Sequence, residues 1–248
     1  GAESAVRRAV EMAEEGADLI DVGGESTRPG AGQVAAQEEI DRVIPVVERL
    51  GRETGLPVSI DTTKAEVACQ ALQAGAHFVN DVSGLHFDPD MAAVVAENRA
   101  GVFLMHTRGR PDEMQNDVAY DDLLGEVADY LNDGIEKAVA AGVPREKIAI
   151  DPGIGFGKDA AGNLAILRRL SELSDFGYPV LLGTSRKSFI GKIIQQKDPQ
   201  QRLHGTLATI ALGVERGAAI FRVHDVRPAR EAALTAWAIC REAMPTTD

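Results

Sequence analysis

Cysteine is nearly absent from this sequence: only Cys69 and Cys240 occur, and both lie in Ala-rich segments with helical periodicity. Two isolated cysteines exclude a disulfide framework and are typical of a reducing compartment. No run approaches the roughly 20 apolar residues needed to span a bilayer. The first residues, 1–16, have the pattern of an amphipathic helix and not of a signal peptide. We therefore expect a cytoplasmic protein that has no membrane partner.

Basic residues are also scarce. There are 26 Lys and Arg against 38 Asp and Glu, which gives a formal net charge of −12. A protein with this balance has no basic stripe to neutralise phosphates, so nucleic acid is excluded as a partner. There is no low-complexity run and no long linker rich in Pro, Gly or Ser. We expect residues 1–248 to form one domain, a common length for a single α/β barrel.

Short apolar runs alternate with longer helical patterns along the whole chain. The runs are rich in β-branched or aromatic residues and lack polar alternation, as expected of parallel strands that are covered on both faces. The predicted strands are Asp18–Val22, Pro57–Ile60, His77–Asn80, Val102–Met105, Ile148–Ile150, Val180–Leu182 and Ala219–Val223.

Helical periodicity predicts eight helices around these seven strands, and several of them end in a glycine that suits a left-handed cap. The clearest are Ser4–Glu15, Glu38–Thr54, Lys64–Ala74, Leu123–Ala141, Asn163–Ser171, Arg202–Arg216 and Ala229–Ala243, and the capping glycines are Gly16, Gly55, Gly75, Gly142 and Gly217. A chain that begins and ends on a helix, with seven strands between, matches an α/β (β/α)8 TIM barrel without its first strand. A seven-stranded open sheet flanked by helices fits the same count.

Polar residues follow every predicted strand immediately. They include Asp21, Asp61, Asn80, His106, Asp151, the segment Gly183–Ser188 and the segment Arg222–Asp225. In a barrel the carboxyl ends of all strands meet at one mouth, where active sites are built, whereas an open sheet uses a few strands at one switch point. Because every strand contributes, the pattern favours the closed barrel with one convergent site.

Each of these residues also has an ordinary structural interpretation. Asp21 and Asp61 could cap the helices that follow them, which is the commoner role of an Asp at such a junction. His106 could be a buried histidine with its hydrogen bonds satisfied, and the glycines of residues 151–158 could serve only as turns. The set is harder to explain in this way. Positive side chains gather after the last two strands, where barrels commonly bind phosphate, and near the first: Arg28, Arg186, Lys187, Arg222 and His224.

Seven segments together resemble the signature segments of the dihydropteroate synthase family, in the same order and at compatible spacing. They are GGESTRPGA (23–31), SIDTTK (59–64), VNDVSG (79–84), LMH (104–106), DPGIGFGK (151–158), GTSRKSFIG (183–191) and RVHDV (222–226). The resemblance implies a (β/α)8 barrel that joins 6-hydroxymethyl-7,8-dihydropterin diphosphate to 4-aminobenzoate. It also implies release of pyrophosphate, Mg2+ as a cofactor, a homodimer, and inhibition by sulfonamides.

The resemblance also implies roles for single residues. The catalytic group is Asp61, Lys187, Arg222 and His224. The pterin contacts are Asp61, Asn80, Met105, Asp151, Phe156, Lys187 and Arg222; the diphosphate contacts are Arg28, Arg222 and His224; the 4-aminobenzoate contacts are Thr27, Pro29, Phe156 and Ser188. An amide and carboxylates suit the amino-pyrimidinone edge of a pterin, and the guanidinium of Arg222 could stack on its face.

The sequence departs from the family at its start. The family's first strand, its metal-contacting Asn and the loop after it have no counterpart before Gly1. We therefore expect the first strand and its loop to be missing from the sequence given, and the metal ligands stay unassigned. Two other functions remain open: a pterin-binding relative without synthase activity, and a methyltetrahydrofolate methyltransferase barrel. The second has no diphosphate substrate and thus no use for the cations at residues 185–187 and 222–224.

Overall fold

The sheet contains seven strands in the part of the chain that the computed structural model describes, residues 1–27 and 30–245. All neighbouring strands are parallel, and their order in the sheet is their order in the sequence. The predicted strands are all present, with ends shifted by at most two residues. They are β1 (Ile20–Gly23), β2 (Val58–Asp61), β3 (Phe78–Asp81), β4 (Gly101–Met105), β5 (Ile148–Asp151), β6 (Val180–Leu182) and β7 (Ala218–Phe221).

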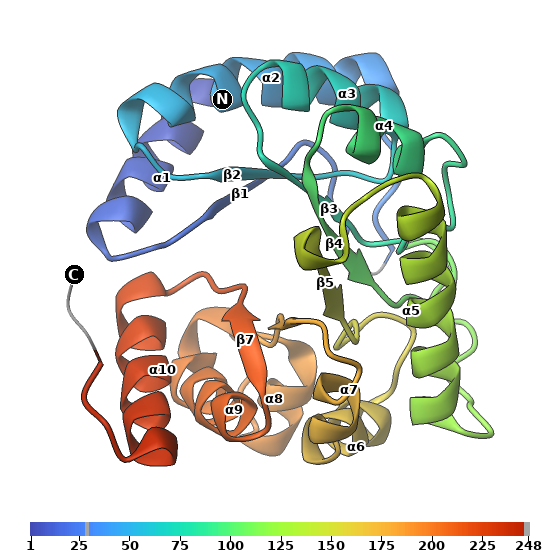
Figure 1. Ribbon diagram of the computed structural model, residues 1–248. Helices are drawn as coiled ribbons and strands as arrows, with labels where there is room; N and C mark the ends of the chain where they lie inside the picture. Colours follow the sequence, from blue (N-terminus) through green and yellow to red (C-terminus); the bar gives the residue numbers. More distant parts are fainter. Residues whose placement is uncertain (28–29, 246–248) are drawn as a thin grey trace.

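The helices lie around the outside of the curled sheet (Figure 1). Residues 1–27 and 30–245 form ten α-helices, two more than predicted, because α7 and α8 are each shorter than two turns and leave no periodicity to read. The helices are α1 (Ala2–Glu14), α2 (Ala36–Glu53), α3 (Ala65–Gln73), α4 (Met91–Glu97), α5 (Leu123–Ala140), α6 (Ala160–Arg168), α7 (Ser171–Ser174), α8 (Ser188–Ile193), α9 (Leu203–Glu215) and α10 (Val226–Arg241), with 3-10 helices at Arg145–Lys147 and Pro199–Arg202.

The five glycines predicted to end helices all have positive φ angles, as the left-handed cap requires. None of the helices in the described ranges combines the length and the apolar character of a membrane span.

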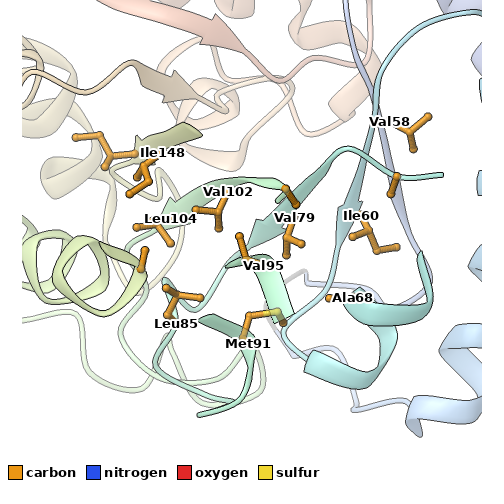
Figure 2. Close-up of a cluster of buried hydrophobic side chains, with 14 of the residues drawn as sticks. Val58, Ile60, Ala68, Val79, Leu85, Met91, Val95, Val102, Leu104 and Ile148 are labelled. Carbon is orange, nitrogen blue, oxygen red and sulfur yellow. The ribbon is translucent and has the colours of Figure 1, made fainter. Parts of the chain in front are cut away.

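The outer face of the sheet packs on the helices and forms the main core. Val58 and Ile60 of β2, Val79 of β3 and Leu104 of β4 are fully buried. Figure 2 shows this region, in which the strand side chains meet Ala68, Leu85, Met91 and Val95. Each fully buried aliphatic side chain of this size contributes about 1.5–3 kcal/mol by leaving water. This interface with the helices explains why the strand segments are apolar.

The inner face of the sheet forms a second, smaller apolar cluster. Phe78 and Phe103 stack with their ring centroids 5.3 Å apart, and the cluster also contains Leu19, Ala149, Leu181 and Ile220. Its members lie in strands or directly before one. Strand side chains thus pack on strand side chains here, as inside a barrel, whereas an open doubly wound sheet carries helices on both faces. The open-sheet alternative is wrong.

The two edge strands, β1 and β7, are joined by contacts between side chains. Arg222, which follows β7, pairs with Asp21 of β1. On the outside, Arg230 of α10 donates to the carbonyl of Gly16 and to Asp18, just before β1. The sheet therefore curls until its ends approach each other. The fold is a (β/α)8-type barrel with seven strands in the described ranges, as predicted.

Candidate active site

The two-residue period of the strands aims polar side chains into the mouth of the barrel. Side chains of a strand alternate between faces, so Asp61 shares the inner face with Ser59, and Asn80 shares it with Phe78. In the strand register Asp61 is the partner of Asn80, and Met105 is the partner of Asp151. The inner face therefore ends in a ring of side chains at the carboxyl ends of the strands: Asp21, Asp61, Asn80, Met105 and Asp151.

Arg222 holds two of these carboxylates. Its Nε lies 2.7 Å from Asp21 Oδ2, and its Nη2 donates to Asp61 Oδ2. Asp21 also accepts hydrogen bonds from Ser59 Oγ and, at 3.5 Å, from Asn80 Nδ2. Neither Asp caps a helix, since the N-cap residues of α2 and α3 are Ala35 and Lys64 and neither helix has a side-chain cap. The capping interpretation of Asp21 and Asp61 is therefore wrong.

Asp61 keeps one acceptor atom without a partner. Its side chain is 5% exposed, and its Oδ1 is buried with no hydrogen bond from any described residue. Burial raises the pKa of Asp61 to about 6, against the opposing charge of Arg222, and the nearby Asp21 raises it further. An orphaned buried carboxylate oxygen costs free energy unless a donor reaches it. Asp61 Oδ1 is thus an acceptor that a ligand donor can complete.

Asp151 and Lys187 are two further charged groups of the mouth, and each affects the pKa of the other. Burial raises the pKa of Asp151, and Lys187 opposes that rise. Burial likewise lowers the pKa of Lys187 to about 8, with Asp151 opposing. Asp151 Oδ1 accepts the N–H of Gly153 at 2.7 Å. The ammonium of Lys187 donates to the carbonyl of Ile154 and lies 4.8 Å from the ring centroid of Phe156.

The remaining cations of the last two strands differ in their surroundings. Arg186 makes two hydrogen bonds to Asp225, of 2.9 and 2.6 Å, which compensate its charge. Contrary to the expectation from the sequence, Arg186 therefore does not add its charge to an anion site. His224 is exposed, and its Nδ1 lies 2.9 Å from Ser185 Oγ. Of the residues predicted to hold the diphosphate, Arg222 and His224 lie at the end of β7, whereas Arg28 lies outside the described residues.

A pocket opens beside Asp61. It is lined by Thr27 and Asp61 among the predicted residues, and by others that include Glu25, Phe87 and Arg110. The guanidinium carbon of Arg110 lies 4.5 Å from the ring centroid of Phe87. Glu25 fixes the loop that forms one wall, because its Oε1 accepts the N–H of Val34 at 2.7 Å. This pocket is a second compartment next to the ring of carboxylates.

The comparisons with known proteins agree with this geometry. The model of the family "Pterin binding enzyme" matches residues 1–224. The chain is 51% identical over 223 residues to the dihydropteroate synthase of Synechocystis, which covers 90% of this chain and 77% of the relative. It is 47% identical to the Bacillus subtilis dihydropteroate synthase, covering 91% and 76%.

The chain belongs to the pterin-binding enzyme family, among the dihydropteroate synthases.

Solved dihydropteroate synthase structures superpose closely on it. The Clostridium difficile enzyme with pteroic acid has a TM-score of 0.91 at 48% identity, over 97% of this chain and 89% of that one. The Xanthomonas albilineans enzyme with 4-aminobenzoic acid has a TM-score of 0.91 at 45% identity, covering 98% and 86%. The Yersinia pestis enzyme with a sulfonamide drug has a TM-score of 0.93 at 43% identity, covering 98% and 87%.

Most residues that the resemblance to dihydropteroate synthases selected lie together in this structure. Asp61, Asn80, Met105 and Asp151 lie at the carboxyl ends of neighbouring strands, Lys187 and Arg222 face Asp151, and Phe156 lies against Lys187. Ser188 begins α8, is exposed, and does not line the pocket beside Asp61. Pro29 lies outside the described residues. The roles of all these side chains toward a ligand stay predictions.

Two features of the site escaped the sequence analysis, and one interpretation that it left open can be decided. His106 has the satisfied structural role that was left open, since it is buried and bound to Lys158 at 2.8 Å. Lys158 and Lys64 are the last residues of two signature segments, but the sequence analysis gave neither of them a role. The pairing of Arg110 with Phe87 had no signal, because no motif connects the two loops.

Proposed function

We propose that this chain joins 6-hydroxymethyl-7,8-dihydropterin diphosphate to 4-aminobenzoate, forming 7,8-dihydropteroate and releasing pyrophosphate. The observation that carries the proposal is the ring of inner-face groups at the strand ends, in which Asp61 Oδ1 is a buried acceptor with no partner among the described residues. It is supported by the relatives, whose names give this activity, and by related structures that hold pteroic acid and 4-aminobenzoic acid.

The pterin binds at the mouth through its amino-pyrimidinone edge. Asp151 and Asp61 accept from the amino and ring N–H groups, and the amide of Asn80 supplies a donor and an acceptor. Lys187 leaves the carbonyl of Ile154 to donate to the pterin ring, while Met105 and Phe156 provide apolar wall. The guanidinium of Arg222 offers its plane to the ring, because its Nε and Nη2 already bind Asp21 and Asp61.

The reaction breaks the bond between the pterin methylene carbon and the diphosphate oxygen. Negative charge develops on the departing diphosphate, where Arg222, His224 and Arg28 stabilise it. Positive charge develops on the pterin methylene, and the carboxylate of Asp61 stabilises it through the ring. The amine of 4-aminobenzoate forms the new C–N bond and then loses a proton to solvent. Catalysis consists of positioning and electrostatics, with no nucleophile from the protein.

The second substrate lies in the pocket beside Asp61. Thr27 lines this pocket together with Phe87 and Arg110, and the guanidinium of Arg110 suits the carboxylate of 4-aminobenzoate. The resemblance also implies contacts from Pro29, which lies outside the described residues, and from Phe156 and Ser188, which do not line this pocket. A sulfonamide, which imitates the aminobenzoate, competes for the same position.

Mg2+ is implied by the family resemblance. Among residues 1–27 and 30–245, no group of three or more His, Cys, Asp or Glu side chains could hold a metal ion. The carboxylates of Asp21 and Asp61 are engaged by Arg222. The described residues therefore do not by themselves form a magnesium site, and no step above passes through a metal.

We also propose a homodimer and a cytoplasmic location. Support for the dimer comes from the apolar side chains that α9 and α10 expose, namely Leu212, Leu234, Trp237 and Ile239. The exposed surface of a monomeric protein rarely carries such a group of large apolar residues. The two cysteines are both free thiols, as expected in a reducing compartment.

The activity is tested by adding both substrates and Mg2+ and measuring the two products. Pyrophosphate and 7,8-dihydropteroate should form in equal amounts. Lys187→Met should lose at least about a hundredfold in rate, as expected when a group in contact with the reacting substrate is removed. Lys192→Met, the same change at an exposed site on α8, should match wild type. Binding of the pterin without turnover would instead support an inactive pterin-binding protein.

A further inference from the structure

A lysine is buried in the turn that follows β5. Lys158 is 3% exposed, and within the described ranges its ammonium forms no ion pair with a carboxylate. Burying an ammonium without a paired charge is costly, so a protein keeps such a group only where its contacts compensate. Burial accordingly lowers the pKa of Lys158 well below its usual value, and the charge of Asp151 opposes that fall. Lys158 has no part in the reaction steps described above.

Three acceptors surround the ammonium of Lys158. Its Nζ lies 2.8 Å from His106 Nδ1, 2.9 Å from the carbonyl of Gly153 and 2.8 Å from the carbonyl of Phe156. An ammonium has three N–H donors, so all three are used. His106 accepts through Nδ1 because burial lowers the pKa of its imidazole to about 2, which keeps the ring neutral.

The loop between Asp151 and Lys158 is held through its carbonyl groups. Each carbonyl from residue 153 to residue 157 accepts a hydrogen bond from a side chain. The donors are Lys158 for Gly153 and Phe156, Lys187 for Ile154, Gln115 for Gly155 and Tyr120 for Gly157. Lys158 is the donor that ties two points of the loop to each other and to the end of β4.

The charge of Lys158 also acts on Asp151. The charged groups that face this carboxylate are Lys187, Arg222 and Lys158, and all three oppose the rise in pKa that burial imposes on it. Lys187 and Arg222 stand on the side of the proposed ligand. Lys158 stands behind the loop, where a methyl group placed on Gly153 would lie 3.3 Å from its Nζ.

We propose that Lys158 is a positioning residue for pterin binding, which fixes the loop carrying Phe156 and acts on Asp151 from behind that loop. This inference rests on the proposed function, because it assigns Lys158 a role in the pterin site. It predicts that Lys158 does not touch the substrate. Its effect reaches the pterin through the ionised carboxylate of Asp151 and the fixed position of Phe156.

The test compares Lys158→Met and Lys158→Gln with Lys147→Met. Methionine preserves the volume but removes the charge and the three hydrogen bonds, whereas glutamine keeps two donors without the charge. Lys147 is an exposed lysine directly before β5, so it makes a matched control at the opposite end of the same strand. The affinity for a 7,8-dihydropterin is measured by calorimetry from pH 5 to pH 8, beside the melting temperature.

Lys158→Met should bind the pterin roughly tenfold more weakly, in line with the loss of hydrogen bonds to a charged group. The acid limb of its binding curve should move up by roughly one pH unit, because the pKa of Asp151 rises when a facing cation is removed. Lys158→Gln should recover part of the affinity but keep the shifted limb. Lys147→Met should match wild type in both.

Unchanged affinity and an unmoved acid limb in either folded variant would overturn the proposal. Loss of folding in both variants would also contradict it, since Lys158 would then serve the fold and not the site. A wild-type protein that binds no pterin at all would refute the proposed function itself, a result that the variants cannot produce. The two failures are therefore distinct.

Discussion

The Nε of Arg222, at the end of β7, lies 2.7 Å from the carboxylate of Asp21 on β1, so this side chain connects the two edges of the sheet. The same guanidinium reaches Asp61 at the end of β2. Its pKa is raised because these two carboxylates outweigh the opposing effect of burial. One side chain thus joins β7 to β1 and β2, with neither of which β7 pairs in the described sheet, and it places a positive charge at the centre of the proposed substrate site.

Arg222→Ala should weaken the binding of pyrophosphate and destabilise the fold together. The change removes a proposed diphosphate contact and leaves Asp21 and Asp61 without their cation, which costs about 3–5 kcal/mol for buried partners. Calorimetry with pyrophosphate and the melting temperature report on the two effects. Arg227→Ala, at an exposed position on α10, is the control. Equal pyrophosphate affinity in the Arg222 variant and wild type would remove Arg222 from the anion site.

The stability of the ligand-free protein should fall as pH rises from about 4 to about 6, because of Asp61. Its pKa rises from 3.8 to about 6 on folding. In this window the native state binds more protons than the unfolded state. The contribution of Asp61 to the free energy of unfolding is therefore fully present below about pH 4 and is lost as pH passes 6. The loss amounts to about 1–3 kcal/mol. Buried Asp81 and Asp151, whose pKa values are also raised, act in the same direction.

Urea unfolding at several pH values, for wild type and Asp61→Asn, measures this dependence. The variant cannot ionise at position 61 and should show a flatter profile, with the free energy of unfolding closest to wild type at low pH. Identical slopes in both proteins would show that Asp61 titrates in the native state as it does in the unfolded chain.

Gly153→Ala should destabilise the protein far more than Gly177→Ala. Both glycines have positive φ, +68° and +77°, so both substitutions cost about 1 kcal/mol or more in backbone strain. A Cβ on Gly153 would also lie 1.9 Å from the carbonyl oxygen of His106, whereas one on Gly177 meets no atom within 4 Å. The overlap adds about 1–3 kcal/mol. Equal losses of melting temperature would mean that the loop after β5 moves away without cost.

Lys64 should be essential to the loop wall beside the second pocket. Its Nζ lies 2.6 Å from Glu25 Oε2 and 2.7 Å from Glu39 Oε2, and Glu39 is completely buried. Lys64→Met leaves a buried carboxylate without its cation, at a cost of about 3–5 kcal/mol. Adding Glu39→Gln should restore part of this stability, which denaturant unfolding of a double-mutant cycle measures. Strictly additive effects would contradict the pairing.

The sequence predicts the barrel and its mouth well, for a physical reason. Most of the strands are apolar along the face that packs on the helices, and Asp61, Asn80 and Asp151 lie at the carboxyl ends of β2, β3 and β5. The change from apolar to polar therefore marks both the end of the strand and its place in the site. Short helices such as α8 leave too few residues for a periodic pattern, so they are missed.

Partners of charged residues are not predictable in the same way. Arg186 had the sequence pattern of an anion-binding residue, yet its guanidinium is bound by Asp225 from the end of another strand. Lys158 is buried because His106 and two loop carbonyls satisfy its donors, and none of this follows from local sequence. Both outcomes depend on tertiary neighbours, which the order of residues along one segment does not specify.

Binding of a 7,8-dihydropterin to wild type and to Asp151→Asn, followed by calorimetry at pH 7 beside the melting temperature, tests the central claim most directly. The carboxylate of Asp151 is buried in the mouth, with its charge facing Lys187 and Arg222. Wild type should bind the pterin. Asp151→Asn should lose affinity by about thirtyfold or more, as expected when one partner of a buried charged hydrogen bond is lost. Its melting temperature should stay within a few degrees of wild type, which corresponds to a change of about 1 kcal/mol in the free energy of unfolding. Equal affinity in the two proteins, with a large fall in the melting temperature of the variant, would show that Asp151 only supports the turn at Gly153 and that this mouth is not a pterin site.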